Sequence, residues 1–84
     1  MTRADIIQQL KEFIGRELIM TSELAIEDNE PLITGGLIDS FSLAYIGVFI
    51  EVTFGVYIPD TDLTVDNLDT LGQMADRVLR DLPR

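Results

Sequence analysis

Apolar residues in the first part of the chain recur at spacings of three and four, which predicts an amphipathic helix. Thr2 followed by Asp5 is a helix-start signal, with Thr2 as the N-cap residue. The helix is predicted to end near Ile19 or Met20. Its buried face is formed by Ile6, Ile7, Leu10, Phe13, Ile14 and Leu18.

A long connection is predicted over residues 21–38, because Pro31, Gly35 and Gly36 interrupt any helix there. Loops of this length are uncommon in compact domains unless they are functional. Apolar residues are scattered through the segment, so we expect it to pack along the bundle. These residues are Leu24, Ile26, Leu32, Ile33, Leu37 and Ile38.

The second predicted helix runs from Ser40 to about Phe54, with Asp39 as its N-cap and Gly55 as its stop. It is apolar on nearly all sides. Helical spacing sorts its apolar residues into two stripes, one of Leu43, Ile46, Ile50 and Phe54 and one of Phe41, Tyr45, Val48 and Val52. Either both stripes belong to the core, or the second is exposed and marks a contact surface.

After this helix, residues 56–58 predict an extended connection that ends at Pro59. Residues 60–65 predict one short helical turn with Leu63 pointing inward, and Asp69 is the predicted N-cap of the last helix, which Pro83 ends. The chain is therefore predicted to be one all-α domain, residues 1–84. We expect a four-helix bundle with three long helices, a short third helix and a long loop between helices 1 and 2.

Charge and composition exclude several classes of function. The net charge is −9, and twelve acidic residues but no basic one lie from Glu17 to Asp76. This charge argues against nucleic acid or anionic membranes as ligands and fits either a solvated surface or one that attracts basic partners. Without cysteine or histidine, the chain offers no His-assisted nucleophile and no His/Cys metal site. With neither a signal-peptide core nor a membrane span, we expect a cytoplasmic protein. We expect a monomer, and a weak dimer through the apolar second helix stays open as the alternative.

Ser40 is the candidate functional residue. It follows a glycine pair and opens a helix, so its side chain is expected to be exposed where the helix dipole favours a phosphate. No general base accompanies it, and the GLIDS segment does not fit the nucleophile motif of hydrolases. Ser40 is therefore interpreted as an acceptor that another enzyme modifies. Asp-Ser before an apolar run is also an ordinary helix start, and that simpler interpretation remains open.

The whole chain resembles the acyl carrier protein family. The resemblance depends on Gly36-Leu37 before the Asp39-Ser40 pair, on Phe41 after it, and on Phe54-Gly55 and Ile58-Pro59-Asp60 after the second helix. It implies that a phosphopantetheinyl transferase, using Mg²⁺ held mainly by that enzyme, attaches 4′-phosphopantetheine to Ser40. The arm would hold acyl or aminoacyl groups as thioesters and pass them from a loading enzyme to acyl-transferring enzymes. The chain itself would catalyse nothing.

The family's partner-recognition positions correspond to Leu37, Asp39 and Phe41. We add Tyr45, Val48 and Glu51 on the second helix, where the acidic residues usual in fatty-acid carriers are largely replaced. In this respect the chain resembles stand-alone D-alanyl, aminoacyl or peptidyl carriers, and a dedicated or secondary-metabolic pathway is expected. Ala44 and Gly47 leave room either for an acyl chain or for close helix packing.

Three other functions compete with the carrier interpretation. An acidic helical module that binds a partner without being modified is the main alternative. A Ca²⁺ loop beginning at Asp60 is disfavoured, because Val65 and Leu71 stand where such a loop needs Gly and Glu. An independent enzyme is disfavoured because no base or electrophile is paired with the acidic residues.

Overall fold

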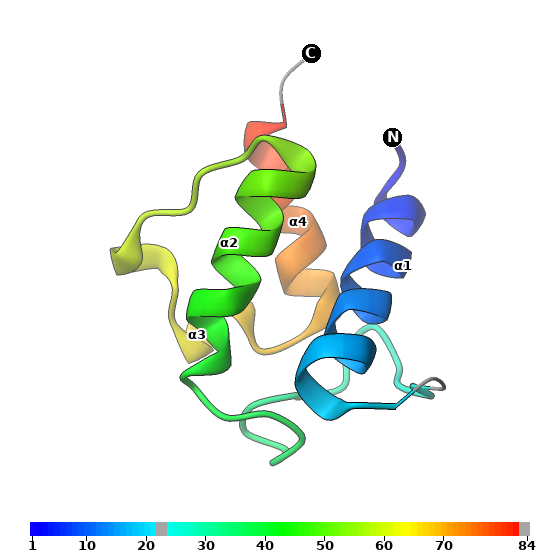
Figure 1. The fold of residues 1–84 in the computed structure, drawn as a ribbon. Helices are drawn as coiled ribbons and strands as arrows, with labels where there is room; N and C mark the ends of the chain where they lie inside the picture. Colours follow the sequence, from blue (N-terminus) through cyan, green and yellow to red (C-terminus); the bar gives the residue numbers. More distant parts are fainter. Residues whose placement is uncertain (22–23, 83–84) are drawn as a thin grey trace.

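The computed structural model describes residues 1–21 and 24–82, and within them it contains helices and connections but no strand (Figure 1). The long helices are α1 (Arg3–Phe13), α2 (Ser42–Phe54) and α4 (Leu71–Asp81), and α3 (Val65–Leu68) is a single short helix. The predicted all-α architecture, with its long segment between the first two helices, is confirmed. Pro83, the predicted stop of the last helix, lies outside the described residues.

The first helix begins and ends where the sequence indicates. The Thr2 hydroxyl accepts a hydrogen bond from the Asp5 N–H at 3.1 Å, and the Asp5 carboxylate accepts one from the Thr2 N–H at 3.0 Å. The last part, Ile14–Ile19, is a π-helix, which the spacing did not predict. It ends at Met20, whose φ of 65° lies in the left-handed region, and the Thr21 N–H donates to the Gly15 carbonyl at 2.8 Å. A Cβ on Gly15 would lie only 3.3 Å from the Thr21 carbonyl oxygen, so glycine allows this close return of the chain.

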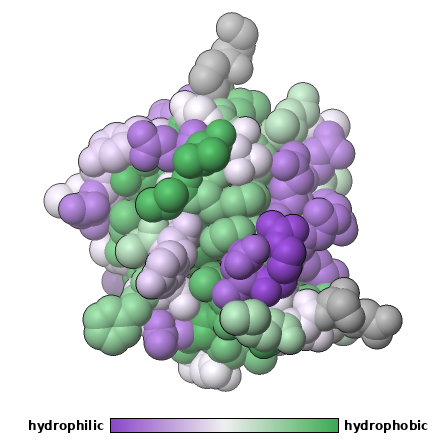
Figure 2. Space-filling model, in the orientation of Figure 1, coloured by the Kyte–Doolittle hydropathy of each residue, from purple (hydrophilic) through white to green (hydrophobic). Residues whose placement is uncertain are grey.

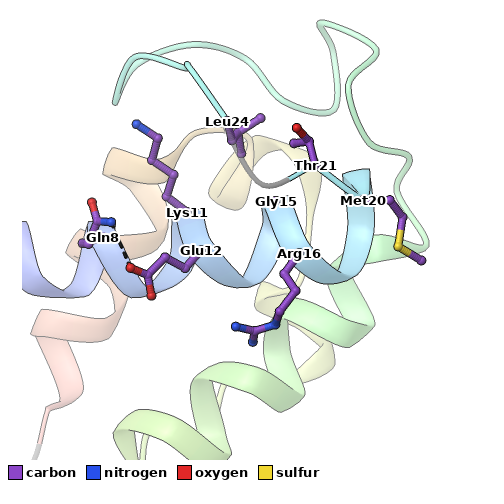
Figure 3. A pocket seen from close by; sticks show the side chains of 8 residues that line it. All are labelled: Gln8, Lys11, Glu12, Gly15, Arg16, Met20, Thr21 and Leu24. Atoms are coloured by element: carbon purple, nitrogen blue, oxygen red, sulfur yellow. Dashed lines mark hydrogen bonds between the residues drawn. The ribbon is translucent and has the colours of Figure 1, made fainter.

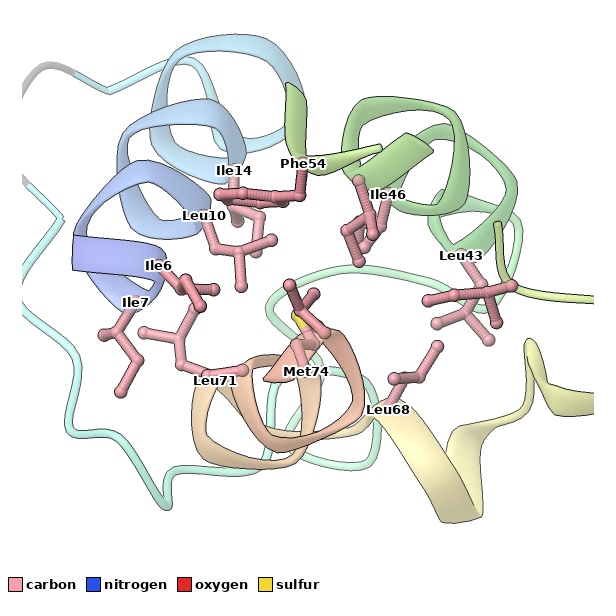
Figure 4. Close-up of a cluster of buried hydrophobic side chains, with 14 of the residues drawn as sticks. Ile6, Ile7, Leu10, Ile14, Leu43, Ile46, Phe54, Leu68, Leu71 and Met74 are labelled. Carbon is pink, nitrogen blue, oxygen red and sulfur yellow. The ribbon is translucent and has the colours of Figure 1, made fainter. Parts of the chain in front are cut away.

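The core lies between α1, α2 and α4, which turn their apolar faces toward one another (Figure 4). Each fully buried aliphatic side chain contributes about 1.5–3 kcal/mol relative to exposure. Leu32 and Ile38 from the long connection are also buried, which confirms that this loop packs along the bundle. The remaining core side chains include Ile6, Leu10, Ile14, Ile46, Ile50, Val56, Ile58, Leu68, Leu71, Met74 and Val78.

Helix α2 starts at Ser42, two residues later than predicted, because Ser40 and Phe41 form a tighter turn before it. The Leu43 N–H donates to the Ser40 carbonyl at 3.2 Å. This bond joins residues three apart, whereas an α-helix joins residues four apart. The N-cap position of α2 is Phe41 and not Asp39 as predicted, although the Asp39 Oδ1 accepts from the Ser42 N–H at 3.2 Å. The helix ends at Gly55, whose φ of 73° is the left-handed conformation expected of a glycine stop.

The connection from α2 to α4 contains a 3₁₀ turn, Asp60–Asp62, and then α3, which begins where the single predicted turn ends. Leu63 points inward as predicted and packs on α2. The contact is close, since a Cβ on Gly47 would lie 3.0 Å from the Leu63 Cδ2. Gly47 therefore allows close packing here. Arg77 of α4, with only 10% of its side chain exposed, ties this turn to the bundle through Asp62 at 3.2 Å and Asp81 at 2.6 Å.

Asp69 is not the N-cap of α4, so that prediction is wrong. Thr70 takes this place, with its hydroxyl accepting from the Gln73 N–H at 3.0 Å. The Gln73 side-chain oxygen accepts in return from the N–H groups of Thr70 (3.1 Å) and Asp69 (2.9 Å). This reciprocal capping satisfies the end of the helix without the Asp69 carboxylate, which turns instead toward the long loop.

Candidate functional site

Ser40 is exposed at the point where the long loop enters α2. The loop closes on itself just before it, because the Leu32 carbonyl accepts hydrogen bonds from the N–H groups of Leu37 (2.9 Å) and Ile38 (3.1 Å). Gly36, with a φ of 84°, provides the turn that makes this closure possible. The buried side chain of Ile38 then anchors the chain two residues before Ser40.

The backbone around Ser40 can receive an anionic group. Within the described part of the chain, the N–H groups of Ser40 and Phe41 donate no hydrogen bond. The Ser40 hydroxyl likewise has no hydrogen-bond partner among these residues. These donors lie at the positive end of the α2 dipole, which stabilises a phosphate placed there.

A groove of about 790 Å³ extends from Ser40 along the loop. Half of its lining residues are aliphatic, its polar groups are the hydroxyls of three residues (Thr34, Ser40 and Ser42), and Asp39 is its one ionisable side chain. Such a lining suits a slender chain that is part apolar and part amide. The lining residues are Leu18, Ile33, Thr34, Gly36, Leu37, Ile38, Asp39, Ser40, Ser42 and Val65.

The second apolar stripe of α2 is exposed, which decides the question that the sequence left open. Phe41 and Val52 are each 80% exposed, and Tyr45 and Val48 are 64% and 62% exposed. The first stripe is buried. Figure 2 shows apolar residues gathered over the middle of the face where α2 runs, with hydrophilic residues on the side of α1. Exposed apolar surfaces of this kind often mark contact sites, so the stripe is a candidate docking surface.

The other predicted recognition residues lie near this stripe. Glu51, the single charged residue of α2, is exposed, and Leu37 is 42% exposed at the groove beside Ser40. Tyr57, which was not predicted as a site residue, is 64% exposed between buried Val56 and Ile58. The alternation of inward and outward side chains in an extended segment would have identified it.

An aromatic groove of about 550 Å³ borders the stripe where α2 meets the end of α1. The rings of Phe13 and Phe49 are stacked there with their centroids 4.3 Å apart. Tyr45 lines this groove and also belongs to the exposed stripe. The apolar surface of α2 is therefore continuous with a recess that could accept a partner's side chain.

Asp69 connects the loop before Ser40 to the start of α4, a link that spacing did not predict. Its Oδ1 accepts from the N–H groups of Ile33 (2.7 Å) and Thr34 (3.1 Å), and its Oδ2 accepts from the Thr34 hydroxyl at 2.6 Å. Its carbonyl accepts from the Leu32 N–H at 2.7 Å. Partial burial acts to raise the pKa of Asp69, but the bonds from Thr34, Ile33 and Leu32 outweigh it and hold that pKa below its ordinary value.

A further groove of about 710 Å³ lies along α1 and contains none of the predicted site residues (Figure 3). Lys11 and Arg16 line it together with Glu12. Glu12 accepts a hydrogen bond from Gln8 at 3.0 Å, and Arg16 is paired with the adjacent Glu17. These contacts point to no particular ligand.

Comparison with known proteins gives no match. This holds for family models, for curated proteins and for solved structures. The residues that the structure describes contain no group of three or more Asp, Glu, His or Cys side chains placed to hold a metal ion. None of their helices is long and apolar enough to cross a membrane.

Proposed function

We propose that this protein is an acyl or aminoacyl carrier whose Ser40 accepts 4′-phosphopantetheine from coenzyme A. The observation that carries the proposal is the exposed Ser40 hydroxyl at the entrance of α2, beside two N–H donors and next to an exposed apolar stripe. The resemblance of the sequence around Ser40 to carrier proteins supports the same conclusion. The absence of a general base fits an acceptor that relies on a separate enzyme.

The transfer requires one displacement at Ser40. The serine Oγ attacks the phosphorus of coenzyme A that bears the pantetheine and forms a new P–O bond. The bond from that phosphorus to adenosine 3′,5′-bisphosphate breaks, and the serine proton leaves to a base of the transferase, which also holds Mg²⁺. The N–H groups of Ser40 and Phe41 are placed to interact with the resulting phosphodiester.

The residues of this chain then hold and present the arm. When bound, 4′-phosphopantetheine supplies a thiol that carries an acyl or aminoacyl group as a thioester, which a chain without cysteine cannot do with its own side chains. The groove along Leu37, Ile38 and Val65 offers an aliphatic surface against which the arm can rest.

Docking is assigned to the exposed stripe of α2. Phe41, Tyr45 and Val48 are the residues on which we expect the contact energy to concentrate, because aromatic anchors dominate protein interfaces. The acidic surface, and Glu51 and Asp39 within it, would mainly accelerate the encounter with a basic partner. Increasing salt should therefore slow association with a loading enzyme more than it speeds dissociation.

The test is the intact mass of the protein after incubation with coenzyme A, Mg²⁺ and a broad-specificity phosphopantetheinyl transferase. Wild type should gain one phosphopantetheine and Ser40→Ala none. Ser42→Ala is the matched control, because Ser42 lies two residues away and its loss leaves the acceptor in place. If wild type gains no mass with several transferases, or if Ser40→Ala gains as much as wild type, the proposal is wrong.

The exposed stripe also supports a second candidate, an interaction module that needs no modification. This candidate predicts that a partner binds wild type and Ser40→Ala with equal affinity, while Tyr45→Ala weakens both. A carrier instead requires Ser40 for any transfer of cargo. Failure of modification together with stripe-dependent binding would place the module first.

A further inference from the structure

We propose that Asp69 is a positioning residue that holds the long loop in the shape that presents Ser40 for modification. This inference rests on the proposed function. Asp69 lies in the connection between α3 and α4, and it belongs neither to the serine motif nor to the exposed stripe. It nevertheless receives four hydrogen bonds from three successive residues of the loop, Leu32, Ile33 and Thr34.

A continuous series of hydrogen bonds runs from Asp69 to the start of α2. Asp69 fixes residues 32–34, and the Leu32 carbonyl then accepts from the N–H groups of Leu37 and Ile38. The Gly36 N–H donates to the Ile33 carbonyl at 3.0 Å, which closes the turn between them. Ser40 follows Ile38 after one residue, so this loop leads directly into the turn that carries the serine.

The carboxylate acts on the part of the loop that the core does not hold. The side chains of Leu32 and Ile38 are buried and anchor the two ends of the loop. Between them, Thr34, Gly35 and Gly36 are exposed, and Ile33 is only partly buried. Without the Asp69 carboxylate, the Ile33 and Thr34 N–H groups lose their acceptor, and this exposed part can sample other shapes while the bundle stays folded.

The wall of the groove beside Ser40 is built from the same residues. Ile33 and Thr34 line that groove together with Leu37 and Ile38. Loosening the loop therefore changes the surface that a transferase meets beside Ser40, while buried Ile38 keeps its place. A transferase that binds only the ordered loop would find a smaller fraction of the carrier in that form. Its apparent affinity for the carrier would fall in proportion to the ordered fraction.

The experiment compares Asp69→Ala and Asp69→Asn with wild type as substrates of the transferase. Asp66→Ala is the control, because it removes a nearby exposed carboxylate for which the described residues offer no side-chain hydrogen bond. We expect Asp69→Ala to raise the KM for the carrier about tenfold with kcat within about twofold of wild type. Asp69→Asn keeps a carbonyl acceptor for the two N–H groups and should recover most of the loss. Asp66→Ala should behave as wild type.

Hydrogen exchange and circular dichroism separate positioning from stability. The amides of Ile33 and Thr34 should exchange about tenfold faster in Asp69→Ala, while those of Ile46 and Ile50 change much less. If Asp69 only stabilised the fold, KM would rise only as far as the folded fraction falls. A tenfold rise in KM would then require a largely unfolded protein, which circular dichroism would detect.

Three results would overturn the role of Asp69. The first is a wild-type KM for Asp69→Ala, whether or not exchange is faster. The second is a raised KM accompanied by equal acceleration at Ile46 and Ile50, which indicates global unfolding. The third is failure of wild type itself to accept the arm, which overturns the proposed function as well. Modification of wild type with an unchanged KM for Asp69→Ala overturns the role of Asp69 alone.

Discussion

The two apolar stripes of α2 make opposite predictions for stability. Ile50 belongs to the buried stripe and is fully inaccessible to solvent, whereas Val52, two residues further on, is 80% exposed. We consider Ile50→Val, which removes one methylene group from the core, and Val52→Ala, which removes two methyl groups from the surface. The smaller deletion is predicted to have the larger effect.

The magnitudes follow from burial and helix propensity. Deleting a core methylene from isoleucine costs about 0.5–1.5 kcal/mol, so Ile50→Val should lower the unfolding free energy by about 1 kcal/mol. Val52 is 80% exposed, so it keeps only about a fifth of the 1.5–3 kcal/mol that full burial of such a side chain contributes. Its burial therefore contributes about 0.3–0.6 kcal/mol. Alanine is the better helix former by about 0.5 kcal/mol, and this gain offsets the loss. Val52→Ala should therefore be neutral.

Thermal and urea unfolding, followed by far-ultraviolet circular dichroism, provide the assay. A change of 1 kcal/mol corresponds to about 4–8 °C in Tm for a domain of this size. Ile50→Val should lower Tm by that amount, and Val52→Ala should leave it within about 2 °C of wild type. If Val52→Ala destabilises as much as Ile50→Val, the second stripe is covered, and the proposal of a free docking surface fails.

Three further changes test particular contacts. Gly35→Ala should lower Tm more than Gly36→Ala, because a Cβ on Gly35 would clash with the Pro31 carbonyl oxygen, whereas a Cβ on Gly36 would meet nothing within 4 Å and only its φ of 84° opposes a side chain. Equal Tm values for the two variants would contradict this. Arg77→Met removes two charge-assisted hydrogen bonds, to Asp62 and Asp81, whose carboxylates stay partly hydrated. It should lower the free energy of unfolding, measured by urea titration, by about 2 kcal/mol. A loss under about 0.5 kcal/mol would show that these ion pairs contribute little to stability. Since the pKa of Asp69 is lower in the folded state, its contribution is complete above the pKa of an unfolded aspartate, about 3.9, and is lost as the pH falls through the lower folded value. Asp69→Asn should therefore flatten the acid limb of the Tm-versus-pH curve, and an unchanged limb would be inconsistent with these hydrogen bonds.

Periodicity predicted most of the fold because three helices have clear apolar faces and local end signals. Thr2 with Asp5 capped α1, and Gly55 ended α2, since both signals act within a few residues. The π-helical end of α1 was missed because it depends on the close return of the chain over Gly15, which is a tertiary contact. At α4, both Asp69 and Thr70 are good N-cap residues. The reciprocal partner Gln73 lies three residues after Thr70, which decides between them.

The candidate site was predicted in the parts that depend on one segment. The exposure of Ser40 follows from its place before the second helix, and the grouping of Phe41, Tyr45 and Val48 into one stripe follows from helical spacing. Helical spacing defined two stripes but could not say which would face solvent, because that depends on how α1 and α4 cover α2. The link from Asp69 to Ile33 spans 36 residues, and no local pattern encodes it.

The central claim is that Ser40 carries the prosthetic arm, and locating the modification tests it most directly. Cleavage after basic residues leaves residues 17–77 as one peptide, because no Lys or Arg lies between Arg16 and Arg77. After incubation with coenzyme A, Mg²⁺ and transferase, fragmentation of this peptide should place the added phosphopantetheine on Ser40. No added mass, or added mass on Ser42 or another hydroxyl residue, would contradict the account.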